Sequence, residues 1–273
     1  MKKNKILIIS HLYPFSSNSV GCVFVHKMNL ALIEGGCEID VISPRVFGRG
    51  RVEGRGRIDG INIRFPKYPS FSRYFLGLSS WFAWRSVTPV INDNDYDLIL
   101  AHTAVPDGYI AKKLSRELNI PYFVYIHGAD VQHKINYGKG SYRLIKNVLS
   151  GADKIFVNSS KTKNLVKNRI GLESVIVHMG IEEHDIREIK KGNGKKIISV
   201  CNLGKEKGIQ YVIGALRDIS DKDIKYLIIG SGPYEKTLKE LVVGDERIIF
   251  LGQLSQKEVF KNLAKSDIFV MPS

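Results

Sequence analysis

The sequence is poor in cysteine and has no long apolar run. Its three cysteines, Cys22, Cys37 and Cys201, are an odd number at wide spacings, which excludes a disulfide framework and a cysteine-rich zinc site. No apolar run reaches the roughly 18 residues of a membrane-spanning helix. The amino-terminal apolar stretch, residues 6–10, is shorter than a secretory leader requires. These absences favour a reduced, cytoplasmic chain.

Acidic residues are scarce relative to basic ones. Against 41 Lys and Arg there are 27 Asp and Glu, which gives a net charge of +14. Such an excess favours acidic partners such as phosphates, nucleic acids or anionic lipids. No RNA-binding motif is present, and the glycines follow apolar runs in a way that suits a small phosphorylated ligand. We therefore expect no nucleic-acid partner.

Apolar runs alternate with helical patterns along the chain. Short β-branched runs at residues 6–10, 39–43, 98–101 and 122–126 are separated by helical patterns such as residues 21–34. This alternation is typical of a parallel sheet that is covered on both faces. It lapses over the polar residues 182–196, which we interpret as a linker. The sequence thus predicts an α/β protein with an amino-terminal domain, residues 1–190, and a carboxy-terminal domain, residues 191–273.

After the predicted linker the alternation starts again. Apolar runs at residues 197–201, 226–229, 248–251 and 268–271 alternate with helical patterns at residues 208–217, 234–242 and 256–264. A doubly wound domain usually needs about 100 to 150 residues. We therefore expect two doubly wound domains, of which the second is incomplete.

Polar residues after the first apolar runs are candidate ligand contacts, because ligands of open α/β sheets bind beyond the carboxyl ends of the strands. A long loop containing Tyr13 ends with Gly21 at the start of a predicted helix. Free backbone N–H groups there would attract an anion, although Gly21 could simply begin the helix. His127 and Asp130 follow residues 122–126. A histidine at a strand's carboxyl end is well placed for a ligand, whereas single histidines are more often structural.

Lysines and glycines follow the predicted strands of the second domain. Lys205 and Lys207 precede a predicted helix, an arrangement that suits a diphosphate but could also be a solvated lysine pair. Gly230 and Gly232 either let the backbone approach a ligand or form a tight turn. In the first domain, residues 158–160 supply amide and hydroxyl groups, and one of the two serines is expected to cap a helix.

Metal-binding patterns are lacking. Two D-x-D matches within residues 93–97 precede an apolar run, so they would lie at the amino end of a strand, away from the ligand edge. No zinc spacing and no phosphate-binding G-x-x-x-x-G-K-[ST] loop occurs. We therefore expect no metal site.

In their order and spacing, these segments resemble glycosyltransferase family 4, a family of retaining enzymes of the GT-B type. The matching segments are residues 13–14 with Gly21, and residues 96–102, 126–130, 157–160, 179–181, 207–208, 230–233, 250–252 and 267–273. No single segment is decisive, but together they extend over the whole chain. The resemblance is strongest to enzymes that build capsular, teichuronic or lipopolysaccharide glycans.

The resemblance implies a GT-B fold of two facing Rossmann-like domains and a UDP- or GDP-linked sugar as co-substrate, with no metal and no other cofactor. It implies that His127 contacts the transferred sugar and that Tyr13, Asp130 and Ser159 lie on the acceptor or sugar side. Fixed cations and helix N-termini would stabilise the leaving diphosphate. The implied donor-binding residues are Gly21, Asn202, Lys205, Lys207, Gly230 and Gly232.

The sequence departs from the family pattern at two places. Asn202 stands where many members have an arginine, so we expect Lys205 to supply the missing cation. The family continues beyond the segment at residues 272–273 with a glycine-rich turn and an E-x7-E motif that hold the donor. We therefore expect weak or no transferase activity from these 273 residues, as in a truncated enzyme.

A basic, aromatic segment is a candidate membrane contact. Residues 64–85 contain four basic residues, eight aromatic residues and no acidic residue, and their apolar positions partly follow helical spacing, as in an interfacial amphipathic helix. We expect peripheral contact with the anionic inner face of the membrane, where a lipid-linked acceptor would be met. A core-packed helix with a basic rim is the alternative. The candidate contact residues are Arg73, Trp81, Trp84 and Arg85.

The leading interpretation is an enzyme of cell-surface polysaccharide biosynthesis. It would transfer a sugar, with retention, from a nucleotide sugar to a lipid-linked or growing glycan. One alternative is a non-catalytic remnant that binds a membrane or a partner. A nucleotide-sugar epimerase of similar double-Rossmann architecture fits the ordered segments less well.

Overall fold

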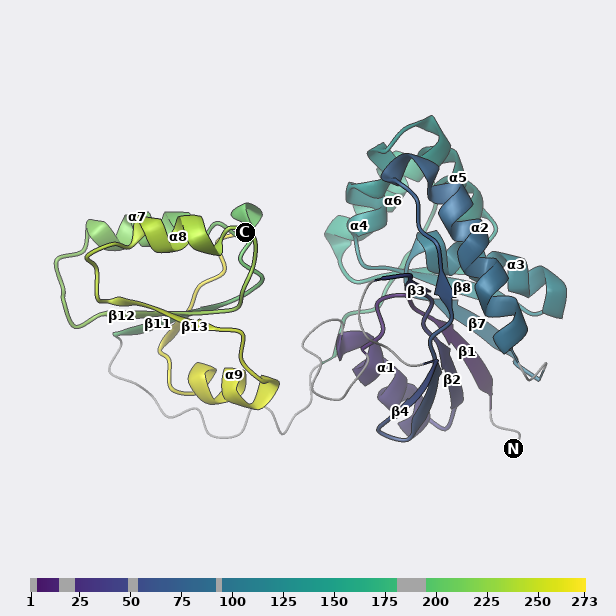
Figure 1. Ribbon diagram of the computed structural model, residues 1–273, viewed down its shortest axis with the longest axis horizontal. Helices are drawn as coiled ribbons and strands as arrows, with labels where there is room; N and C mark the ends of the chain where they lie inside the picture. The colour runs from purple at the N-terminus through teal and green to yellow at the C-terminus, as the bar shows by residue number, and fades with distance from the viewer. Residues whose placement is uncertain (1–3, 15–22, 49–53, 92–94, 181–194) are drawn as a thin grey trace. The chain divides into compact units, whose positions relative to one another are not determined.

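The computed structural model describes residues 4–14, 23–48, 54–91, 95–180 and 195–273 (Figure 1). The chain divides into two compact units, residues 1–180 and 181–273. The domain boundary predicted near residue 190 and most of the predicted linker, residues 182–196, lie outside the described residues, but Lys196 at the end of that linker already begins strand β11 (Lys196–Val200). In the described part of the chain, no helix has both the length and the apolar character needed to cross a bilayer.

The first unit is built on a sheet of eight strands in the order β10-β9-β8-β7-β1-β2-β5-β4. Neighbouring strands run parallel except β4 and β5, which form an antiparallel pair. A separate parallel pair joins β3 (Arg45–Val46) to β6 (Lys67–Tyr68). The bounds are β1 Lys5–Ile9, β2 Glu38–Ile42, β4 Arg55–Ile58, β5 Ile61–Arg64, β7 Leu98–Ala101, β8 Tyr122–Ile126, β9 Lys154–Val157 and β10 Val175–Ile176.

The central strand β1 shows why its sequence is continuously apolar. Leu7 and Ile9 belong to one buried cluster, whereas Ile6 and Ile8 belong to another. Because successive side chains of a strand point to opposite faces, both faces of the sheet are covered. The doubly wound arrangement predicted from the alternation is therefore confirmed in this unit.

Helices cover the two faces of this sheet unequally (Figure 1). Helix α1 contributes to the cluster around Ile8, and helices α2, α3, α5 and α6 contribute to the larger cluster around Leu7. The helices are α1 Val23–Glu34, α2 Leu76–Val87, α3 Tyr109–Leu118, α4 Ala129–Gln132, α5 Lys139–Ser150 and α6 Ser160–Ile170. Short helical turns lie at η1 Arg73–Phe75, η2 Thr88–Val90, η3 Ala104–Gly108 and η4 Lys134–Asn136.

The second unit contains a four-stranded parallel sheet in the order β13-β12-β11-β14. Helices α7 and α8 lie on one side of this sheet and α9 on the other (Figure 1). The strands are β11 Lys196–Val200, β12 Lys225–Ile229, β13 Ile248–Gly252 and β14 Ile268–Phe269, and the helices are α7 Ile209–Arg217, α8 Glu235–Leu241 and α9 Gln256–Leu263, with a short turn η6 at Lys205–Lys207. This second parallel α/β sheet also agrees with the predicted fold class.

Candidate active site

Three histidines follow three adjacent strands of the first sheet. His102 comes directly after β7, His127 directly after β8, and His11 two residues after β1. Because β8, β7 and β1 are neighbours and run parallel, their carboxyl ends share one edge of the sheet. This is the edge at which open α/β sheets bind ligands.

His11 is fixed by a buried carboxylate. Its Nδ1 lies 3.0 Å from both carboxylate oxygens of Asp107, and its backbone N–H donates to Asp107 Oδ1 at 2.9 Å. The hydroxyl of Thr103 donates to Asp107 Oδ2 at 3.1 Å. Asp107 is fully buried, whereas the His11 side chain is 21% exposed. The carboxylate therefore sets the orientation of an imidazole that reaches the surface of the unit.

His102 and His127 form a contact between two imidazoles. Nδ1 of His102 lies 3.2 Å from Nε2 of His127, and the two rings are within 10° of parallel. His102 is fully buried and His127 half-buried. Burial lowers the pKa of His102 to about 3 and that of His127 to about 4, because a buried imidazole loses the hydration that stabilises its charged form. Both rings are neutral at physiological pH.

Aromatic rings hold His127 in place. The ring of Tyr125 packs against His127 with ring centroids 4.6 Å apart, and Phe24 packs against His127 at 4.9 Å. The Tyr125 hydroxyl donates to the carbonyl of Val177, so the tyrosine is itself anchored. The orientation of the His127 ring is therefore fixed by packing as well as by His102.

Asp130 and Ser159, predicted on the sugar side, bond to the protein itself. Asp130 is 1% exposed, accepts a hydrogen bond from the Ala104 backbone at 3.0 Å and pairs with Lys134 at 2.9 Å. Ser159 caps α6 by accepting from the Thr162 backbone at 3.2 Å, which agrees with the predicted cap. These contacts brace the loops around His127.

Tyr13 is also engaged internally. Its side chain is 1% exposed, and its hydroxyl lies 2.6 Å from Nδ1 of His26, whose Nε2 lies 2.8 Å from Asp59. Burial raises the pKa of Tyr13 to about 12. Gly21, predicted near the donor phosphates, lies in residues 15–22, outside the described residues.

In the second unit, the glycines predicted near the donor lie where two loops touch. A Cβ atom on Gly230 would lie 1.8 Å from the carbonyl oxygen of Cys201, and one on Gly232 would lie 2.5 Å from the carbonyl oxygen of Leu203. Gly230 also has φ of +132°, a conformation that side-chain-bearing residues rarely adopt. These two glycines are therefore required by the contact between the loops that follow β11 and β12.

The predicted donor cations lie beside these loops. Lys205 and Lys207 belong to the turn η6 before α7; Lys205 and Asn202 are exposed, and Lys207 is half-buried. Gly208 separates η6 from α7 and lies against the loop after β14, because a Cβ on Gly208 would meet Pro272 at 3.1–3.3 Å. The loops after β11, β12 and β14 thus meet at the carboxyl edge of the second sheet.

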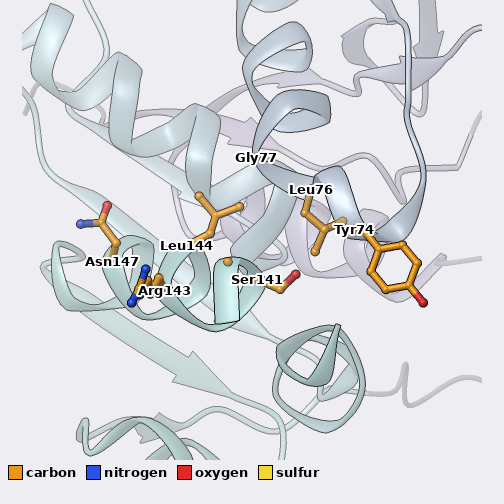
Figure 2. A pocket seen from close by; sticks show the side chains of 8 residues that line it. Tyr74, Leu76, Gly77, Ser141, Arg143, Leu144 and Asn147 are labelled. Carbon is orange, nitrogen blue, oxygen red and sulfur yellow. The ribbon is translucent and has the colours of Figure 1, made fainter. Parts of the chain in front are cut away.

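The basic, aromatic segment forms η1 and α2 and lines a groove. Tyr74, Leu76 and Gly77 lie on one side of this groove, and Ser141, Arg143, Leu144 and Asn147 of α5 lie on the other (Figure 2). The groove has a volume of about 450 Å³. Large apolar side chains of the same segment are exposed, namely Phe71 (43%), Tyr74 (65%), Phe75 (59%), Leu78 (44%) and Trp81 (41%).

The four candidate membrane residues differ in their surroundings. Arg73 begins η1, and Trp81 and Arg85 are exposed on α2. Trp84 is partly buried against the core of the first unit, and its indole nitrogen is enclosed. The alternative of a core-packed helix therefore describes one face of α2.

Comparison with known proteins identifies the family. Residues 23–184 match the model of Glycosyltransferase Family 4, and residues 180–273 match that of Glycosyl transferases group 1. The chain belongs to glycosyltransferase family 4. The resemblance inferred from the ordered segments is thus confirmed, and His102 and His127 lie within the family 4 match, whereas His11 precedes it.

Relatives of this family 4 chain extend beyond its length. It is 29% identical to the putative teichuronic acid biosynthesis glycosyltransferase TuaC of Bacillus subtilis, over 98% of this chain and 75% of TuaC. Its fold is similar to that of sucrose-phosphate synthase from Thermosynechococcus elongatus (TM-score 0.78, 16% identity, 99% and 76% of the two chains). It is also similar to that of HepE from Anabaena in complex with UDP and glucose (TM-score 0.68, 17% identity, 99% and 74%). The fold is GT-B.

Three residues of this candidate site are not singled out by the sequence analysis, namely His11, His102 and Asp107. His11 lies in the long loop after β1, and its partner Asp107 is 96 residues away in the sequence. His102 belongs to one of the segments that resemble the family. Position at a strand's carboxyl end could have drawn attention to His11 and His102, but nothing in the sequence links Asp107 to His11.

Proposed function

We propose that this chain is a retaining glycosyltransferase that transfers a sugar from a nucleotide-sugar donor to a lipid-linked or growing glycan. The observation that carries this proposal is the histidine cluster at the carboxyl edge of β8, β7 and β1, in which the ring of His127 is fixed and half-buried. This choice of substrates is supported by the place of His127 in a family 4 chain. It is also supported by the description of TuaC as a teichuronic acid biosynthesis glycosyltransferase and by the UDP and glucose in the HepE complex.

The charges that develop on the sugar and on the leaving group during the reaction suggest a role for each unit. Breaking the bond between the sugar and the diphosphate places positive charge on the sugar and negative charge on the leaving group. Lys205, Lys207 and the N-terminus of α7 provide the positive groups for that diphosphate. Neutral His127 provides a hydrogen-bonding contact for the sugar rather than a charge.

His127→Ala tests this assignment. Where turnover is measurable, or in a complete enzyme of this sequence, we expect it to fall by about 100-fold, as when one positioned hydrogen-bond group of an active site is removed. The assay is nucleotide release and glycoside formation by the purified chain, with UDP-glucose and GDP-mannose as donors and lipid extracts as acceptors. His133→Ala, which removes an exposed histidine, is the control. Unchanged turnover in His127→Ala would make His127 structural.

Product analysis separates the possible reactions. Free nucleotide together with a glycoside that keeps the donor's anomeric configuration supports a retaining transferase. A glycoside of inverted configuration contradicts retention, and an isomerised sugar nucleotide indicates an epimerase. No product with the full donor panel would agree with the weak or absent activity expected of these 273 residues, and with a non-catalytic binding protein.

We also infer that the α2 surface binds the anionic inner face of the membrane, so that a lipid-linked acceptor is met there. The exposed apolar side chains around Trp81 support this inference. So does the charge of the two helices beside the groove, because α2 and α5 contain basic residues and no acidic residue. Exposed aromatic and basic groups together are typical of interfacial elements.

A further inference from the structure

The contact between His102 and His127 determines where the protons of the two rings lie. Each neutral imidazole carries one N–H and one bare nitrogen. The 3.2 Å contact between His102 Nδ1 and His127 Nε2 requires that one of these nitrogens carries hydrogen and the other does not. Two arrangements satisfy this condition, and they differ in what His127 offers to a ligand.

Burial distinguishes the two arrangements. Nε2 of His102 is fully enclosed and has no hydrogen-bond partner among the residues that the structure describes. If His127 donated to His102, the hydrogen of His102 would sit on this enclosed nitrogen as an unsatisfied N–H. If His102 donates, the enclosed nitrogen carries only a lone pair. Buried N–H groups without a partner are rarer and more costly than buried acceptors without one.

We propose that His102 is a positioning residue that donates from Nδ1 to His127 Nε2 and thereby fixes His127 as its Nδ1–H tautomer. Among the described residues, Nδ1 of His127 has no hydrogen-bond partner, and it is not one of the enclosed unpaired atoms. His127 therefore presents an N–H donor at the ligand edge. A donor of this kind suits a sugar hydroxyl or a phosphate oxygen, and it cannot accept the acceptor's proton.

The surroundings of the pair keep this arrangement. Tyr125 packs against both rings, with centroids 5.8 Å from His102 and 4.6 Å from His127, and a reversed His127 ring would place a carbon opposite His102. The carboxylates of Asp107 and Asp130 interact electrostatically with the two rings. Asp107 is bonded to His11 and Thr103, and Asp130 is paired with Lys134. Neither carboxylate hydrogen-bonds to the two rings in the described part of the chain.

The test is direct measurement of the tautomer. The chain is labelled with 15N-histidine, and two-bond 1H–15N correlations of the imidazoles are recorded from pH 8 down to pH 5.5. His127, assigned by loss of its signals in His127→Gln, is expected to show a protonated Nδ1 and a bare Nε2 throughout this range. A protonated Nε2 of His127 in the wild-type protein would overturn the proposal.

Matched variants test the role of His102. His102→Asn keeps an N–H donor near the position of Nδ1, whereas His102→Leu fills similar space without a donor. We expect His102→Asn to keep His127 as the Nδ1–H form. In His102→Leu, the ratio of Nδ1–H to Nε2–H forms should fall by about fivefold, the effect of losing one neutral hydrogen bond. His133→Asn is the control, and an unchanged ratio in His102→Leu contradicts the proposal.

This inference builds on the proposed contact of His127 with the sugar, but its readout needs no substrate. A chain that transfers no sugar can still show the fixed tautomer, in which case the proposed function fails alone. An active transferase with His127 as the Nε2–H form would overturn the inference and leave the proposed function intact.

Discussion

At the scale of single residues, the polar groups around the first sheet's carboxyl edge mostly bond to one another. The hydroxyl of Tyr13, the carboxylate of Asp130 and the hydroxyl of Ser159 all have partners within the protein. The sequence places such residues near a site but does not show which way each side chain is turned. His127 and His11 differ from them, because each has a ring nitrogen without a hydrogen-bond partner in the described part of the chain.

The buried histidines make stability depend on pH. His102 and His127 have pKa values near 3 and 4 when folded, against about 6.5 in the unfolded chain. Between about pH 6.5 and pH 4 the unfolded state therefore binds more protons, and the free energy of unfolding falls as the pH falls. Fully buried His102 alone contributes a slope of up to about 1.4 kcal/mol per pH unit.

Urea unfolding at several pH values checks this prediction. His102→Asn should flatten the pH dependence, because asparagine does not titrate, and His133→Asn should leave it unchanged. A free energy of unfolding that rises on acidification, or an equal slope in His102→Asn, would contradict the low pKa of His102.

At the scale of elements, the loops after β11 and β12 are held together by close backbone contact. Gly230 and Gly232 were expected either to approach a ligand or to form a turn, and the structure shows that both are needed for packing between the loops. The same glycines keep these loops in register at the edge where the donor is proposed to bind. Their packing role and their proposed role at the donor are therefore compatible.

Two glycine-to-alanine changes distinguish the effect of the close contact between the loops from the general effect of replacing glycine by alanine. Gly230→Ala places a methyl group against the Cys201 carbonyl at positive φ, and we expect it to destabilise the second unit by about 2–3 kcal/mol. Gly214→Ala changes an exposed glycine of α7 with open space around it, and should stabilise by up to about 1 kcal/mol. Thermal unfolding of both variants measures the difference, and equal effects would contradict the close contact.

Most strands and helices could be predicted because their apolar spacing is regular. Residues 98–101, 122–126 and 256–264 match β7, β8 and α9 to within a residue. The antiparallel pair β4 and β5 was not predicted, although Asp59-Gly60 between them is a typical hairpin turn. The partnership of Asp107 with His11 could not be predicted, because it depends on β7 lying beside β1 in the folded sheet.

At the scale of the whole molecule, part of the excess of basic residues lies on a surface of the first unit that also exposes large apolar side chains. Exposed Phe75 and Trp81 lie in η1 and α2, and Arg143 of α5 lines the adjoining groove. Exposed apolar patches of this kind are typical of interaction surfaces. The acceptor side of the reaction is thus proposed to lie close to the bilayer.

Vesicle binding tests this surface. The chain should pellet with vesicles of phosphatidylglycerol at low salt and much less with phosphatidylcholine. Phe75→Ser with Trp81→Ser should weaken pelleting, whereas Tyr211→Ser, which removes an exposed aromatic of the second unit, should not.

The charge is tested in the same assay. Arg143→Gln should lower the affinity by about fivefold, since one cation near an anionic surface is worth about 1 kcal/mol. Lys236→Gln, at an exposed lysine of α8, is its control. Equal pelleting with both lipids, or equal effects of each variant and its control, would contradict membrane contact through α2 and α5.

Strand β1 lies near the middle of the first sheet, yet it precedes the other strands of that sheet along the chain. Its neighbour β2 follows directly after helix α1, but its other neighbour, β7, begins only at Leu98. The half of the sheet that carries His102 and His127 therefore cannot join β1 until much more of the chain has been synthesised. During that interval one edge of a very apolar strand stays open to other chains, so this stage of synthesis is the one most exposed to misassembly.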